Sequence, residues 1–106
     1  MRMQTLSIDI ETYSSVDLKQ SGVYKYVEAP DFEILLFAYA FDDEPVQMVD
    51  LASGDPFPQF VWVALQDPSI VKTAFNANFE RTCIAKHFNK DMPPEQWRCT
   101  AAHSLN

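Results

Sequence analysis

Residues 6–12 read Leu-Ser-Ile-Asp-Ile-Glu-Thr, and apolar and polar side chains alternate strictly along the first six of them. A period of two is typical of a β-strand with one buried face and one face in water. Side chains two residues apart share a face, so Asp9 and Glu11 project together, roughly 6–7 Å apart along the backbone. The sequence therefore predicts a strand that holds two carboxylates side by side.

Two neighbouring carboxylates need a proton, a cationic partner or a metal ion between them. A hard divalent cation such as Mg²⁺ suits oxygen ligands and usually keeps several waters. The alternative is an ordinary strand whose polar face is simply solvated. The stretch by itself leaves both interpretations open.

Composition indicates a single domain over residues 1–106, because this length is close to the commonest domain size and 47% of the residues are hydrophobic. No run of about 18 apolar residues is present, so no membrane span is expected. The first residues do not resemble a signal peptide, which favours the cytoplasm. Cys83 and Cys99 are too few for a disulfide framework or a zinc site and are expected to be buried thiols.

Charge is distributed unevenly along the chain. The formal net charge of −7 argues at first against nucleic acid, since phosphate binding is normally led by Lys and Arg. Residues 1–67 carry 3 basic and 12 acidic side chains, whereas residues 68–106 carry 5 basic and 3 acidic ones. An acidic site that binds divalent metals changes its local sign, so a phosphodiester substrate is not excluded. Most of the acids are expected to serve solubility alone.

The first half of the chain indicates three strands. After the opening strand, residues 18–30 show no clean period and are expected to contain turns. Residues 32–41 predict a long buried strand, residues 42–45 a hairpin loop, and residues 46–51 the returning strand. The pattern predicts an antiparallel three-strand meander.

The second half alternates helical and strand patterns. Asp55 is a candidate N-cap with Pro56 at the first helical position. The predicted elements are a helix over residues 57–66, a strand over 70–75, a helix over 77–88, a strand over 97–100 and a helix that begins at Thr100. Strands followed by helix–strand–helix indicate a mixed α/β or α+β fold with helices packed on a sheet.

Glu80 occupies an unusual position on the second predicted helix. It lies four residues before Ile84 and eight before Phe88, so it shares the apolar stripe that faces the sheet. A buried charge is costly and needs a partner or a metal, although a position at the rim would let Glu80 reach solvent. Asn76 is either the helix cap or a substrate contact, and Arg81 is expected to face outward.

These motifs resemble those of a known family. Asp9-Ile10-Glu11-Thr12, followed by a meander and then Phe75-Asn76-Ala77-Asn78-Phe79-Glu80, is similar to the 3′–5′ exonuclease domain of DEDD nucleases. More narrowly, it resembles the proofreading exonuclease of phage- or prophage-type family A DNA polymerases. Trp97-Arg98-Cys99-Thr100 is similar to the strand that follows in those enzymes. The resemblance implies an RNase H-like fold over essentially the whole chain.

The chain departs from the family pattern in two respects. Glu80 stands where most members have aspartate. The third motif, Tyr or His followed by Asp on a later helix, is absent, since Asp91 and Glu95 lie in a proline-bounded loop and no acid follows His103. We therefore expect a domain truncated at its C-terminus, with weak metal binding and little turnover.

The resemblance implies hydrolysis of terminal phosphodiesters of DNA with two divalent ions, Mg²⁺ or Mn²⁺, about 4 Å apart. Asp9, Glu11 and Glu80 would be the catalytic residues and metal ligands. Thr12, Asn76 and Phe79 would contact the terminal nucleotide, and Tyr13 is a further candidate for stacking on its base. His87 and His103 are expected to be structural.

The implied partners are the 3′ end of single-stranded DNA and the polymerase domain of a longer parent chain. Self-association is also expected, because a truncated sheet would expose apolar surface. One alternative is a non-catalytic nuclease-like module that binds nucleic acid or a polymerase partner. A glycosidase using Asp9 and Glu11 is disfavoured, because carboxylates on one strand do not flank a sugar bond.

Overall fold

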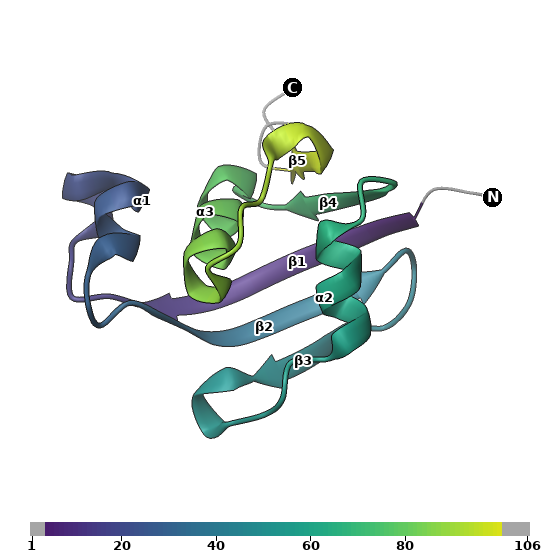
Figure 1. Ribbon diagram of the computed structural model, residues 1–106, viewed down its shortest axis with the longest axis horizontal. Helices are drawn as coiled ribbons and strands as arrows, with labels where there is room; N and C mark the ends of the chain where they lie inside the picture. The colour runs from purple at the N-terminus through teal and green to yellow at the C-terminus, as the bar shows by residue number, and fades with distance from the viewer. Residues whose placement is uncertain (1–3, 101–106) are drawn as a thin grey trace.

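The computed structural model describes residues 4–100, which form a five-stranded mixed sheet with three α-helices (Figure 1). The strands lie in the order β3-β2-β1-β4-β5. The strands are β1 Gln4–Tyr13, β2 Glu33–Phe41, β3 Gln47–Asp50, β4 Ile70–Ala74 and β5 Trp97–Cys99. The helices are α1 Leu18–Glu28, α2 Gln59–Gln66 and α3 Ala77–Phe88, with 3-10 turns η1 Leu51–Ser53 and η2 Pro94–Gln96.

β1 is a strand with one buried and one exposed face, as the alternating pattern predicted, and it lies at the centre of the sheet. It pairs with β2 in the antiparallel direction and with β4 in the parallel direction. Leu6, Ile8 and Ile10 are at most 8% exposed, whereas Asp9 and Glu11 are exposed. The period of two therefore places the apolar side chains on the core face of β1. The carboxylates of Asp9 and Glu11 lie on the face exposed to water.

The predicted strands of the meander, helix α3 and the two later strands are confirmed. β2 and β3 pair in the antiparallel direction, with Phe37 opposite Val49. Helix α3 spans the predicted residues 77–88, and β4 and β5 lie within the predicted strands. The fold is a mixed α/β sheet with helices packed on it. The helix expected after Thr100, with His103, lies outside the described residues.

One helix was missed. Residues 18–30 were expected to contain turns, but helix α1 lies between β1 and β2. Its apolar residues lack helical periodicity, and Gly22 interrupts it with a positive φ of 84° that produces a kink. Asp17 caps the helix by accepting a hydrogen bond from the backbone N–H of Lys19 at 3.0 Å. A short kinked helix of this kind leaves little periodic signal in a sequence.

The predicted start of α2 was wrong. The helix begins at Gln59 with Pro58 at the N-cap, rather than with Asp55 as cap and Pro56 as first residue. Asp55 closes a loop instead, because its carboxylate accepts the backbone N–H of Asp50 at 3.0 Å. The capping preference of aspartate was satisfied by a local turn in place of a helix end.

The core lies between the sheet and the layer formed by α2 and α3, which lie over one face of the sheet in Figure 1. Phe37 is fully buried at its centre and packs edge-on against Phe57, with ring centroids 4.9 Å apart. On the opposite face, Asp9 pairs with Ala38 and Ala38 with Met48, which is 63% exposed. The face that carries the carboxylates is therefore partly apolar and open to solvent.

None of the described helices is both long enough and apolar enough to cross a membrane. Cys83 is buried, as expected, and Cys99 is half-buried with its thiol 3.0 Å from the carbonyl oxygen of Phe75.

Replacing Phe37 by alanine should lower the free energy of unfolding by about 3–5 kcal/mol, because it removes a fully buried ring and leaves a cavity. Urea titration followed by circular dichroism measures this change. Val46→Ala is the control, since Val46 is 68% exposed and should change the stability by less than about 0.5 kcal/mol. Equal effects of the two substitutions would contradict the assigned core.

Candidate functional site

The sheet topology brings the first and second sequence motifs together. Strand β4 pairs with residues 4–7 of β1, so β1 continues beyond the carboxyl end of β4. Helix α3 begins just after that end, with Asn76 as its N-cap. Asp9 and Glu11 therefore lie on the extension of β1 that passes the start of α3. The carboxyl ends of strands next to a parallel crossover are a common place for ligand sites in α/β sheets.

A β-bulge lies at the same point. Glu11 pairs with Leu36 but Thr12 pairs with Ile34, so Leu35 is an extra residue on β2. Bulges of this kind bend the strand and redirect side chains, and they are frequent next to active sites. No pattern in the sequence distinguished Leu35 from its apolar neighbours. This feature was therefore not predicted.

Glu80 is buried in the first turn of α3, at 5% exposure, as its place on the apolar stripe indicated. Its Oε1 atom is buried and, among the described residues, has no hydrogen-bond partner. The pKa of Glu80 is raised from its ordinary 4.5 to about 7, mainly by burial and in smaller part by the charge of Asp9. The backbone N–H groups of Glu80 and Asn76 oppose this shift.

The structure thus brings Asp9 close enough to Glu80 for the two carboxylates to repel each other. Glu11 shares the exposed face of Asp9. Within residues 4–100, however, no three His, Cys, Asp or Glu side chains are close enough to form a metal-binding group. Two carboxylates, one of them with an unpaired buried oxygen, suit a hard cation that completes its shell with water.

The predicted substrate contacts surround the same end of α3, and they make contacts within the protein. Asn76 caps the helix, its side-chain oxygen accepting the N–H of Phe79 at 3.5 Å. The Thr12 hydroxyl forms a hydrogen bond with the hydroxyl of Tyr26 at 2.8 Å. Phe79 is half-buried with its ring 6.0 Å from the ring of Tyr26. The capping role of Asn76 is therefore confirmed.

Tyr26 is the residue that sequence reasoning missed here. It lies on α1 and joins that helix to β1 through Thr12, and to α3 through Phe79. It also packs edge-on against Phe32 at 5.9 Å. Because α1 itself was not predicted, nothing in the sequence indicated that Tyr26 would hold the two motif-bearing elements together.

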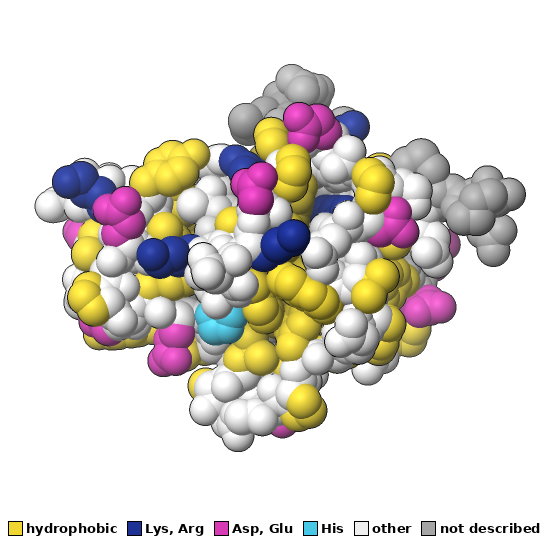
Figure 2. Space-filling model, in the orientation of Figure 1, with side chains coloured by type: hydrophobic (Ala, Val, Ile, Leu, Met, Phe, Trp, Pro, Cys, Tyr) yellow, Lys and Arg dark blue, Asp and Glu magenta, His cyan; other side chains and the backbone are white. Residues whose placement is uncertain are grey.

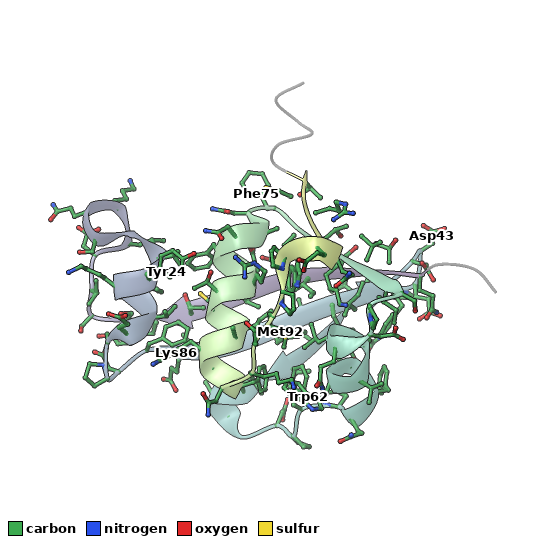
Figure 3. All side chains as sticks on the ribbon, turned by 45° about the horizontal axis from the view of Figure 1, so that its top comes forward. Tyr24, Asp43, Trp62, Phe75, Lys86 and Met92 are labelled. Carbon is green, nitrogen blue, oxygen red and sulfur yellow. The ribbon has the colours of Figure 1, made fainter. Side chains whose placement is uncertain are left out.

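Three exposed aromatic side chains lie on α1, just before α3 and at the end of β1. Figure 3 shows Tyr24 on α1 and Phe75 just before α3, and they are 63% and 70% exposed. Tyr13, at the end of β1, is 50% exposed. Aromatic rings held in water in this way are available for stacking.

Two other side chains on α3 have structural roles. Arg81 was expected to face outward, but it is half-buried and donates to the carbonyl of Met92 at 2.9 Å and to the side chain of Asn78 at 3.0 Å. It thereby ties the loop after α3 to the start of the helix. His87 accepts the N–H of Ile34 through Nδ1 at 3.3 Å, which agrees with the structural role expected of it.

Replacing Glu80 by glutamine should stabilise the chain, and more so at high pH. The raised pKa means that protonated Glu80 favours folding below its ordinary pKa of 4.5, and that this contribution is lost as the pH rises through about 7. Glutamine resembles the protonated form at every pH. The gain in the free energy of unfolding should therefore be about 2 kcal/mol larger at pH 8 than at pH 5.5, measured by urea titration in EDTA.

Glu95→Gln is the matched control, because Glu95 is exposed on η2 and should show no such pH dependence. If Glu80→Gln raised the free energy of unfolding by the same amount at pH 5.5 and at pH 8, the pKa of Glu80 would not be raised in the folded chain.

Comparisons with known proteins relate the chain to a phage DNA polymerase. No model of a known protein family matches the chain, and no solved structure matches it. The chain is 70% identical over 102 residues to a DNA polymerase of Bacillus phage SP02, and the aligned region covers 96% of this chain. It covers only 16% of the phage protein, so the chain is similar to one short segment of a phage DNA polymerase.

Proposed function

We propose that this chain is part of a metal-dependent 3′–5′ exonuclease that hydrolyses terminal phosphodiesters of DNA and proofreads within a DNA polymerase. The observation that carries the proposal is the carboxylate of Glu80, buried with an unpaired oxygen beside the charge of Asp9. A structural role alone does not explain why a helix would bury an acid against a second acid, since the arrangement costs stability. The similarity to a segment of a phage DNA polymerase supports the same assignment.

The proposed fold is RNase H-like. Three antiparallel strands, followed by helix, parallel strand and helix, agree with that arrangement. In the proposal, residues 1–106 are the part of the domain that carries its first two motifs. The third motif is not in this sequence. The full activity is therefore assigned to a longer protein, and for the chain as printed we expect weak metal binding and little turnover.

Asp9, Glu11 and Glu80 would hold Mg²⁺ or Mn²⁺. When bound, such ions neutralise phosphate charge, promote deprotonation of the attacking water and stabilise the leaving oxygen. The charge of Asp9 acts on the buried carboxylate of Glu80, and Glu11 projects from the same exposed face as Asp9. Because Glu80 has a pKa of about 7 without a cation, its carboxylate would have to lose a proton on binding one.

The residues around the acids would position the 3′ end of a single strand of DNA. Asn76 and Thr12 lie at the start of α3 and the end of β1, and Phe79 contributes a half-buried ring. The exposed ring of Tyr13 is available to stack on the terminal base. The polymerase domain of the parent chain is the other proposed partner. Self-association of the isolated chain through its open sheet face is proposed as well.

Asp9→Asn should strongly reduce Mg²⁺- or Mn²⁺-dependent trimming of a 5′-labelled single strand by a protein extended past Asn106. We expect a loss of roughly 10²–10³-fold, the size typical of removing one electrostatic group from a reaction centre. Trimming is followed by gel electrophoresis of the labelled strand. Glu80→Asp should retain activity, because most related enzymes have aspartate at this position.

Asp43→Asn is the control, because it removes one negative charge, as Asp9→Asn does, from the exposed β2–β3 loop (Figure 3). Unchanged trimming by Asp9→Asn would refute the proposal. Metal-independent binding of single-stranded DNA without trimming would instead favour a non-catalytic nuclease-like module.

A further inference from the structure

A cavity of about 340 Å³ lies between the end of α2, strand β4, the loop after α3 and the start of β5. It shares no lining residue with the candidate acidic site. Its volume is at the lower end of the range for small-molecule pockets. The side chains that matter for a ligand in this cavity are those of Lys72, Lys90, Asp91, Leu65, Met92 and Trp97.

Lys72 is the unusual member of this lining. It occupies the middle of β4, and the parallel register places it between Leu6 of β1 and Trp97 of β5 on the buried face of the sheet. It is only 2% exposed. Lysine is almost never buried to this extent unless it is paired. Its amine donates one hydrogen bond, 2.7 Å long, to the backbone carbonyl of Asp67.

The positive charge of Lys72 is weakly compensated. An ammonium group has three donors, and the contact with Asp67 uses a neutral carbonyl rather than a carboxylate. The carboxylate of Asp67 accepts the N–H and hydroxyl of Ser69 at 2.9 and 2.8 Å. Burial lowers the pKa of Lys72, and the charge of Asp67 offsets this only in part. An anion in the cavity would supply the missing counter-charge.

The rest of the lining suits a small amphipathic anion. Lys90 is exposed at the rim and adds a second positive charge, although Asp91 beside it is also exposed and acidic. Leu65, Met92 and Trp97 are buried apolar walls. Figure 2 shows Lys and Arg side chains (dark blue) near a hollow on this face, beside hydrophobic surface (yellow). Met92, labelled in Figure 3, lies next to α3.

We propose that this cavity binds a phosphate group, either inorganic phosphate or the phosphate of a mononucleotide, through Lys72 with Lys90 at the rim. The apolar walls, Trp97 among them, would contact the remainder of a nucleotide. The site is separate from the proposed exonuclease centre and does not depend on divalent cations.

The test is an NMR titration of the ¹⁵N-labelled chain with thymidine 5′-monophosphate and, separately, with inorganic phosphate, in EDTA. We expect the largest shifts at the amides of Gln66, Lys90, Gln96 and Trp97. Equal affinities would identify a phosphate site, and tighter binding of the nucleotide would identify a nucleotide site. EDTA removes the cations that would recruit phosphate to the acidic residues, so this test is independent of the proposed function.

Lys72→Met should weaken binding at least tenfold, and Lys90→Gln should weaken it severalfold without disturbing the fold, because Lys90 is exposed. Lys86→Met removes an exposed charge from α3 outside the cavity and should leave the affinity unchanged (Figure 3). Three results would overturn the proposal: no saturable shifts with either ligand, shifts centred on Asp9 and Glu80, or undiminished binding by both Lys72→Met and Lys90→Gln.

Discussion

The alternation of side chains along β1 is the constraint on which the rest of the structure depends. Because β1 pairs with strands on both sides, a shift of one residue in its register would turn Leu6, Ile8 and Ile10 away from the core and turn Asp9 and Glu11 into it. The core under α2 and α3 and the exposed acids on the other face are two consequences of one pattern. The fold and the candidate site are therefore specified together.

Glu80 links that strand to helix α3 through an unfavourable interaction. The carboxylate of Glu80 is buried and is affected by the negative charge of Asp9. Its pKa is raised because ionising it in this environment costs free energy. Proteins retain such arrangements where a proton or a cation is part of the function, so perturbed acids are concentrated at functional sites.

The uneven charge along the chain also acquires a structural meaning. The acidic first 67 residues contribute Asp9 and Glu11, whereas the more basic remainder contributes Lys72 and Lys90 to a separate cavity. Net charge alone could not reveal this separation, because the two groups lie in different parts of a sheet whose strand order differs from their order in the chain. The formal charge of −7 is therefore a poor guide to the local charge of either surface.

The sequence by itself determined β1, the other strands of the meander, helix α3 and the place of Glu80 on the apolar stripe of that helix, since these follow from local periodicity or from a continuous apolar run; the structure decided that Glu80 is buried. Only the tertiary structure decided the kinked helix α1, the later start of α2, the bulge at Leu35 and the inward contacts of Arg81. The start of α2 and the kink of α1 depend on local turn geometry at Asp55 and Gly22, whereas the position of α1 on β1 and the contacts of Arg81 depend on partners in other elements, such as the hydroxyl of Tyr26 for Thr12 and the carbonyl of Met92 for Arg81. Local periodicity predicts the face of a helix or strand on which a side chain lies. It does not predict which residue of another element that side chain contacts.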